Sequence, residues 1–211
     1  MGKIVFVFNG RPKCGKDTLA TFLIDNLNSH TELTTNRHKF AQLLIDQACC
    51  LSNISLNEWN TRYATEKDVP WNRLLGMSQR EWICYIAEEV VKPKLGRDFY
   101  ARALAENIDK LSEQVHIITD GGFPEEIYEL CECETVDHVV LVRVEMPSVE
   151  YIKDTRKDLS TVEHVKLSHV NLTNIFGGLS DTVMQMMERV YSLLDLFRSK
   201  TDRSIDKDNN L

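Results

Sequence analysis

The sequence predicts an α/β domain in which a parallel β-sheet carries helices on both faces. Continuous apolar runs occur at residues 4–8, 115–120 and 139–144, and segments of helical periodicity lie between them. Unbroken apolar runs are typical of strands buried on both faces, and strands that alternate with helices favour right-handed crossovers in a parallel sheet. The chain has 211 residues, which suits one such domain with a substantial core.

The first apolar run leads into a glycine-rich segment, residues 10–18 (GRPKCGKDT). Its spacing matches the first seven positions of G-x-x-x-x-G-K-[ST], the loop that binds phosphate between a strand and a helix. Gly10 and Gly15 allow a tight turn that points backbone N–H groups at an anion, where the helix dipole also favours negative charge. Lys16 adds a mobile cation for the β- and γ-phosphates, and Lys13 lies in the same loop. We therefore expect a three-layer P-loop NTPase fold that binds ATP.

The sequence leaves the metal ligand of this loop open. Asp17 stands where a Ser or Thr usually holds Mg²⁺, and a hydroxyl follows one residue later at Thr18. A carboxylate can hold a hard cation directly or through water, so both residues are candidates. Asp120 ends the second apolar run, as does the acid that meets Mg²⁺ or its water in other P-loop proteins. The expected cofactors are ATP and Mg²⁺, with Asp17 and Asp120 as metal ligands.

The remaining elements follow from periodicity and from start and stop signals. Helices are expected over residues 19–27, 40–51, 78–91, 98–111, 125–130 and 179–197, and further strands over 32–39 and 170–175. Ser78 precedes Glu81 by three residues, which is the spacing of a capping box, and Pro93 is expected to break the same helix. The polar tail, residues 198–211, has no periodicity and is predicted to be disordered.

One domain over residues 1–197 is expected, with two unusual segments. Residues 52–77 are polar with isolated aromatic side chains, which indicates either an insertion that caps the site or a surface excursion. Residues 145–170 are predicted to form a lid. The basic cluster around Arg156 within it either brings cations onto the transferring phosphoryl group or forms a solvated face.

Composition limits the classes of partner. Lysine and arginine number 25 against 32 acidic residues, and the resulting charge of −7 argues against a long nucleic-acid groove. The six cysteines show neither C-x-x-C nor zinc-ligand spacing, and no secretory signal or 18-residue apolar run is present, so reduced thiols in the cytoplasm are expected. Small nucleotides are the expected partners, with no nucleic acid and no membrane, and a homodimer is left open.

The phosphate loop and three further stretches resemble the phage deoxynucleoside monophosphate kinases. The stretches are residues 94–100 (KLGRDFY), 118–126 (ITDGGFPEE) and 142–147 (VRVEMP), and the turn over 174–179 is also similar. The resemblance implies transfer of the ATP γ-phosphate to a deoxynucleoside monophosphate (dNMP) in host cytoplasm, with Mg²⁺. It implies catalytic roles for Lys16, Asp120, Arg143 and Arg156, and acceptor binding by Arg97, Asp98 and Arg102.

One position departs from the family. Its pattern reads D-x-R-F-P where this chain has Asp120-Gly-Gly-Phe-Pro, so the arginine expected at 122 is absent. Such an arginine would serve the acceptor phosphate or the transition-state charge, and Arg97, Arg102 or Arg143 are candidate replacements. Because the loop reports the donor and not the acceptor, a kinase of another small metabolite and a non-catalytic nucleotide-binding switch are alternative interpretations.

Overall fold

The computed structural model describes residues 2–147, 159–175 and 177–208. Arg156 and the basic cluster around it, predicted to close over the site, lie outside the described residues. Among the described helices, none combines the length and the hydropathy that a bilayer span requires.

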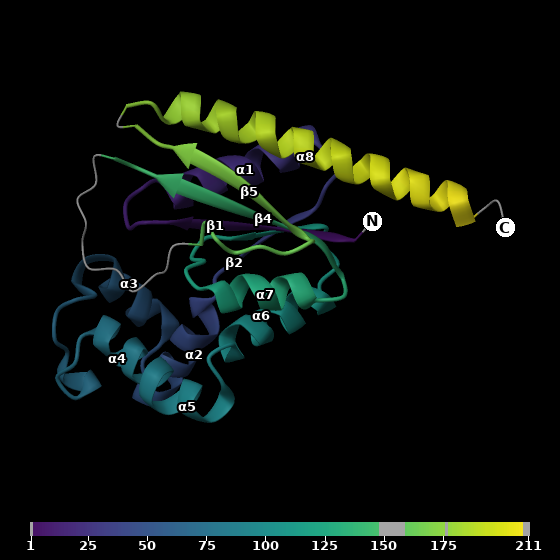
Figure 1. Cartoon of the computed structure of the whole chain (residues 1–211). Helices are drawn as coiled ribbons and strands as arrows, with labels where there is room; N and C mark the ends of the chain where they lie inside the picture. The colour runs from purple at the N-terminus through teal and green to yellow at the C-terminus, as the bar shows by residue number, and fades with distance from the viewer. Residues whose placement is uncertain (1, 148–158, 176, 209–211) are drawn as a thin grey trace.

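A five-stranded sheet forms the centre of the fold (Figure 1). Its strands are β1 (Lys3–Gly10), β2 (Thr35–His38), β3 (Val115–Ile118), β4 (Val136–Glu145) and β5 (Leu167–Thr173). The spatial order is β2-β3-β1-β4-β5, and each neighbouring pair is parallel. All five strands therefore end at one edge of the sheet, with β1 at the centre. The predicted parallel sheet is confirmed.

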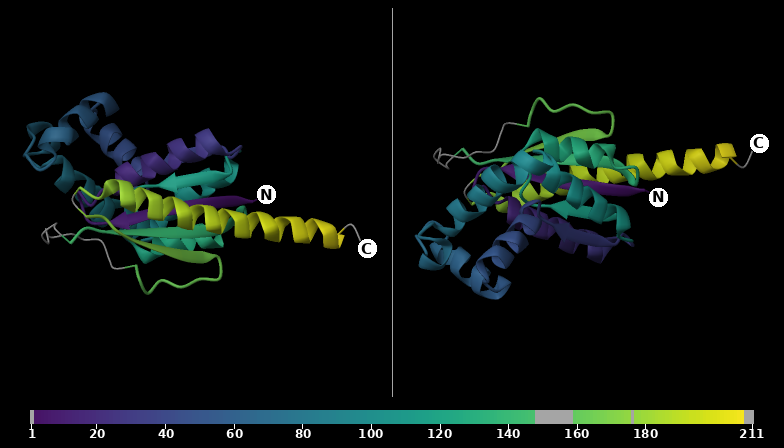
Figure 2. Two further views of the ribbon diagram at one scale, coloured as in Figure 1. Left: turned by 90° about the horizontal axis from the view of Figure 1, so that it is seen from above. Right: turned by 90° about the horizontal axis from the view of Figure 1, so that it is seen from below.

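Helices cover both faces of the sheet (Figures 1 and 2). One face carries α1 (Lys16–His30) and α8 (Leu179–Asp208), and the other carries α6 (Phe99–Lys110) and α7 (Pro124–Glu132). Successive residues of β1 serve the two cores in turn: Phe6 and Phe8 pack with α1 and α8, whereas Val5 and Val7 pack with α6 and α7. With the glycine-rich loop between β1 and α1, this is the three-layer P-loop NTPase fold expected from the sequence.

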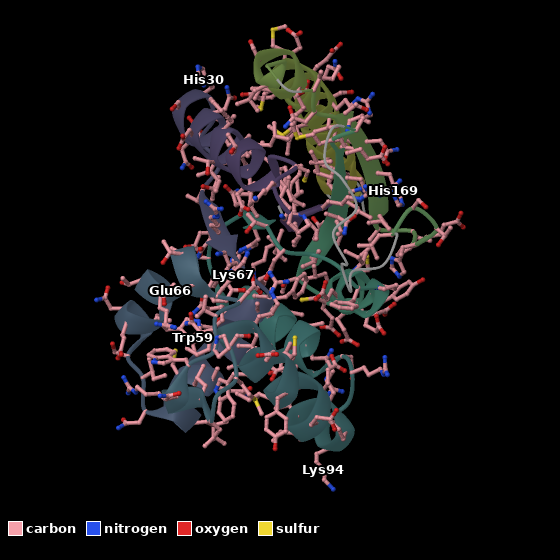
Figure 3. The ribbon with its side chains drawn as sticks, turned by 90° about the vertical axis from the view of Figure 1, so that its left-hand side faces the viewer. His30, Trp59, Glu66, Lys67, Lys94 and His169 are labelled. Atoms are coloured by element: carbon pink, nitrogen blue, oxygen red, sulfur yellow. The ribbon has the colours of Figure 1, made fainter. Side chains whose placement is uncertain are left out.

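A helical lobe, residues 41–95, projects from the end of the sheet at which the strands terminate (Figure 1). It contains α2 (Ala41–Ser52), α3 (Leu56–Glu66), the 3-10 turn η1 (Asn72–Leu74), α4 (Gln79–Tyr85), the π-helical η2 (Ile86–Val91) and α5 (Lys92–Leu95). The lobe has its own core around the fully buried Trp59, and Figure 3 shows Lys94 pointing away at its outer end. Residues 52–77 thus supply the centre of this lobe, since Trp59 belongs to them.

The capping box of Ser78 and Glu81 is confirmed, but Pro93 does not end the helix. Helical residues continue through η2 and α5 to Leu95, and Gly96 then ends the run with φ of +97°. The π-helical residues change the hydrogen-bond register before Pro93. The proline is therefore the second residue of a new α-helical segment, where its missing N–H needs no partner.

Two further segments can be compared with their expectations. α8 is helical through Asp208 and extends beyond the sheet (Figure 2), and its last turns cover residues 198–208, for which the sequence predicts a disordered tail. That segment has no apolar periodicity, but it also has no Pro or Gly to end a helix. Within the predicted lid, Leu159 and Val162 are buried in the core beside α6 and α7, so this described part belongs to the body.

Candidate nucleotide-binding site

The segment between β1 and α1 has the backbone of an anion-binding loop. A Cβ on Gly10 would lie 2.5 Å from the Val144 carbonyl oxygen, and one on Gly15 would lie 2.5 Å from Asn174 Nδ2. Gly15 also has φ of +92°, which disfavours any side chain. α1 begins at the next residue, and no side chain caps its N-terminus. The dipole of α1 is therefore directed at the loop, as phosphate binding requires.

Asn174 holds this loop in shape from the end of β5. Its side-chain Nδ2 donates to the Cys14 carbonyl at 2.9 Å in a buried hydrogen bond, and its backbone N–H donates to the Glu145 carbonyl at 2.7 Å. Cys14 itself is fully buried in the core beside α1. The sequence analysis did not assign Asn174 to the site. Its signals in the sequence are its place after an apolar strand and at the start of the turn over 174–179 that resembles the kinase family.

Lys16 is buried, with 8% of its surface exposed, and its Nζ lies 4.0 Å from Asp17 Oδ2. The other oxygen of Asp17 lies 3.2 Å from Arg37 Nη2 of β2, and Arg37 also donates to Thr21. The first turn of α1 is thus connected to the end of β2 by an ion pair. Asp17 and Thr18 are both exposed, so the choice between them as metal ligand stays a prediction.

Asp120 follows β3 and accepts two backbone hydrogen bonds from the N-terminus of α2. Its Oδ1 accepts from Phe40 at 2.8 Å and its Oδ2 from Ala41 at 3.0 Å. Burial raises the pKa of Asp120, while these two bonds and the charge of Lys39 act in the opposite direction. The observed contact of Asp120 is therefore that of a helix cap, and its role as a metal ligand stays a prediction.

Glu126 forms a second carboxylate cap beside the first. Its Oε2 accepts from the backbone N–H groups of Gly122 at 2.7 Å and Phe123 at 3.0 Å, at the start of α7. Burial raises the pKa of Glu126 to about 8, and the charge of Asp120 contributes to the rise. Position 122, which has an arginine in the resembled family, here serves as a backbone donor. Sequence reasoning missed Glu126, although its place two residues after Pro124 is a helix-start signal.

Arg143 lies on β4 beside the end of β1. In the parallel register Arg143 pairs with Asn9 of β1 and with Asn171 of β5. Its Nη1 donates to Asn171 Oδ1 at 3.3 Å, and its Nη2 lies 3.6 Å from Glu145 Oε1. The backbone of Arg143 thus lies beside the strand that opens the phosphate loop, while its guanidinium contacts Asn171 and Glu145, and its role at the acceptor phosphate stays a prediction.

The other predicted acceptor residues lie at the junction of α5 and α6. Arg102 pairs with Asp98 at 2.9 Å and donates to the Leu95 carbonyl at 2.9 Å, so both side chains brace the turn at Gly96. Arg97 is exposed. The hydrogen bonds and ion pair of Asp98 and Arg102 are with each other and with the Leu95 carbonyl, and within the described residues none of them joins the loop of residues 10–18. The role of these three residues in acceptor binding stays a prediction.

The oxygens at this edge suit a hydrated Mg²⁺ on a bound triphosphate. The described residues contain no group of three or more His, Cys, Asp or Glu side chains placed to hold a metal ion. Mg²⁺ in nucleotide sites is usually held by one or two protein ligands, together with phosphates and water. The hydroxyl of Thr18 and the carboxylates of Asp17 and Asp120 supply donors of that kind.

An open cavity of about 450 Å³ lies between α2 and α6, at the carboxyl end of β2. Its polar lining includes the cations Arg37 and Lys39, and also Gln42, Asp46 and Asn107. Tyr100 contributes a wall, and its hydroxyl donates to Gln47 Oε1 at 2.8 Å. No sequence motif marks this cavity, because its two walls are some 60 residues apart in the chain.

Neither a protein-family model nor a curated protein matches the chain. Among solved structures, it is similar to a gluconokinase from Sinorhizobium meliloti 1021, with 11% identity and a TM-score of 0.49 over 94% of this chain and 97% of that one. It is also similar to a sugar kinase from Janibacter sp. HTCC2649, with 16% identity and a TM-score of 0.43 over 92% and 95%. At these values the likeness carries no argument about activity, and the fold rests on the strand order and the loop.

Proposed function

We propose that the chain is an ATP- and Mg²⁺-dependent phosphotransferase that converts a dNMP to the diphosphate, with release of ADP. The observation that carries the donor half is the N-terminus of α1, which combines two sterically required glycines, a buried lysine and no side-chain cap. The acceptor half comes from the sequence resemblance. A kinase of another small metabolite would use the same donor site.

The loop would act on ATP by position and charge. Phosphoryl transfer leaves little covalent chemistry for the protein, which has to hold donor and acceptor in line and neutralise the developing charge. Backbone N–H groups at the start of α1 would bind the β- and γ-phosphates, and Lys16 would follow the transferring group. Because Lys16 is almost fully buried, its charge would act in a site with little screening by water.

Bound Mg²⁺ would neutralise phosphate charge, and Thr18, Asp17 and Asp120 are the residues proposed to hold it. Arg143 would face the acceptor phosphate. This role is supported by its register beside Asn9, the residue that precedes the loop, and by its guanidinium geometry, which suits phosphate oxygens. Arg143 would thus replace the arginine that the resembled family has at position 122.

The test is ADP release from ATP and Mg²⁺ with each common dNMP and NMP in turn, and with gluconate and simple sugars as non-nucleotide acceptors. Stimulation by one or a few dNMPs, absent from a folded Lys16→Ala protein, would support the proposal. Stimulation by a sugar or sugar acid alone would support the alternative kinase. If no acceptor stimulates ADP release while ATP still raises the melting temperature, the result would favour a non-catalytic nucleotide-binding switch.

A further inference from the structure

The basic part of the cavity between α2 and α6 lies close to both candidate metal ligands. Arg37, which lines the cavity, forms the 3.2 Å ion pair with Asp17 in the first turn of α1. Lys39 also lines it, and its charge is close enough to Asp120 to act on that carboxylate. The cavity therefore reaches the phosphate-transfer site at its cationic part, where an anionic group of a second substrate would be drawn.

Asp46 lies on α2 seven residues after Lys39, and with Gln42 it gives the cavity acceptors for N–H donors. Gln42 and Asp46 are one turn apart on α2, and Gln42 Nε2 donates to Asp46 Oδ1 at 2.9 Å. Within the described residues, the second oxygen of Asp46 and the Oε1 of Gln42 accept no hydrogen bond, so acceptors are presented to the cavity. Asn107 of α6 adds an amide that can donate and accept.

Apolar and aromatic side chains complete the lining. Phe40, Leu43, Tyr100 and Leu104 contribute to it. The hydroxyl of Tyr100 is engaged by Gln47, which holds the ring in place. A volume of about 450 Å³ lies in the range of pockets for small organic ligands. The cavity thus offers apolar and aromatic walls, hydrogen-bond acceptors and cations. A ligand with a flat ring, polar atoms at the edge of the ring and an anionic group matches these three features.

We infer that this cavity binds the acceptor nucleotide, with its base edge toward Asp46 and its phosphate directed past Arg37 and Lys39 toward the transfer site, where Arg143 is proposed to face it. The inference rests on the proposed function for the class of substrate. A carboxylate pairs best with a base that presents a ring N–H beside an amino group, as guanine does, because two parallel hydrogen bonds then form. Thymine presents its ring N–H between two carbonyl oxygens, which a carboxylate repels. The order of affinity is therefore dGMP first and dTMP last.

The experiment is calorimetric titration of the full chain with dGMP, dAMP, dCMP and dTMP, without ATP. Ala103→Trp fills the cavity from α6 and is expected to weaken every dNMP at least about tenfold. Asp46→Asn should weaken dGMP about tenfold and dTMP less than about threefold, because only guanine loses a paired acceptor. Lys39→Met should weaken all four dNMPs alike, since it removes charge rather than base recognition.

Matched controls are Asp25→Asn on α1 and Lys110→Met at the end of α6, two exposed residues away from the cavity, which should leave dNMP binding unchanged. ATP affinity should stay at the wild-type value in Ala103→Trp and Asp46→Asn. If Ala103→Trp fails to fold, Asp46→Asn and Lys39→Met decide the matter. Binding of dNMP at wild-type strength by these variants, or no dNMP binding to the wild type at millimolar concentration, would overturn the inference.

Turnover separates this inference from the proposed function. If a dNMP stimulates ADP release in Ala103→Trp with an unchanged KM, the acceptor binds elsewhere, so the inference fails and the proposed function stands. If dGMP binds in the cavity and no dNMP stimulates ADP release from the wild type, the proposed function fails and the pocket stands.

Discussion

Three helix N-termini meet at the carboxyl edge of the sheet, and they differ in what occupies them. At α2 the carboxylate of Asp120 accepts from two backbone N–H groups, and Glu126 does the same at the start of α7. At α1 the first residue follows Gly15, and no side chain caps the helix. The dipoles of the three helices are alike in sign, so the side chains decide which terminus can take an anion.

A side-chain carboxyl group that accepts the N–H groups of a helix N-terminus leaves those N–H groups unavailable to a phosphate. The caps on α2 and α7 therefore leave α1 as the site for a triphosphate among these three termini. Asn9 also holds the loop after β3, because its Nδ2 donates to the Gly121 carbonyl at 2.9 Å. The N-terminus of α1 is thus free of a side-chain cap, whereas the N-termini of α2 and α7 are capped by Asp120 and Glu126.

The largest expected effect is at the N-terminus of α1, which no side chain caps and which we call the open terminus. The capped N-termini of α2 and α7 are the closed termini. Lys16→Ala should lower kcat by at least about 10², the scale on which one preorganised electrostatic group is commonly felt. The measurement is ADP release by a variant whose circular dichroism matches the wild type. Lys110→Ala, at an exposed position of α6, is the control and should retain full activity. Near-normal turnover by folded Lys16→Ala would remove the loop as the donor site.

The next effect is at a closed terminus. Asp120→Ala should lower the free energy of unfolding by about 1–3 kcal/mol, because two backbone N–H groups of α2 lose their buried acceptor. Asp120→Asn retains one acceptor oxygen and should cost less. Urea unfolding measures both values. Unchanged stability in Asp120→Ala, together with lost Mg²⁺-dependent activity, would show that the residue serves the metal rather than the helix.

The cap on α7 should make stability depend on pH. The pKa of Glu126 rises in the folded chain from its ordinary 4.5 to about 8, so the folded state binds more protons between these values. Its contribution to stability is therefore full below pH 4.5 and is lost as the pH rises through 8. Glu126→Gln should flatten this decline in urea unfolding measured from pH 5 to 9. Asp120→Asn should move the decline to lower pH, because the charge of Asp120 helps to raise the pKa of Glu126.

A decline that persists unaltered in Glu126→Gln would assign the pH dependence to other groups. His116 is separable from Glu126, since burial lowers the pKa of its imidazole to about 4 and its contribution is instead lost as the pH falls below 6.5.

The smallest effect is expected for the exposed ion pair beside the open terminus. Asp17 is 61% exposed at its side chain, and its partner Arg37 is 38% exposed. Asp17→Asn should therefore change the free energy of unfolding by no more than about 1 kcal/mol. If Asp17→Asn lowered the free energy of unfolding as much as Asp120→Ala does, the open and closed termini would not differ in how much their carboxylates stabilise the fold.

The sheet, the loop and most helices could be predicted because their signals are local. The unbroken apolar run before Gly10 and the spacing from Gly10 to Lys16 each lie within one short segment. The caps could not be predicted in the same way, because Asp120 meets Phe40 across 80 residues of chain. From the sequence, Asp120 is a strand-end acid and a candidate metal ligand, and nothing in it indicates a helix cap.

The cavity and the lobe were hidden for a related reason. Trp59 reads as an isolated aromatic residue in a polar segment, and only tertiary packing with α2 and α4 buries it. The cavity walls come from residues 37–46 and 100–107, and each is an ordinary helix flank or strand end by itself. Hydrophobic periodicity predicts which residues of a segment face inward, but not which segments pack against one another.

The most direct test of the contrast among the three termini is a backbone amide NMR titration of the full chain with ATP and Mg²⁺. The open-terminus account expects the largest shift changes at the amides of residues 10–18, and small changes at Ala41 and Phe123, whose N-termini are already capped. Changes as large at Ala41 or Phe123 as in the loop, or none in the loop, would contradict it.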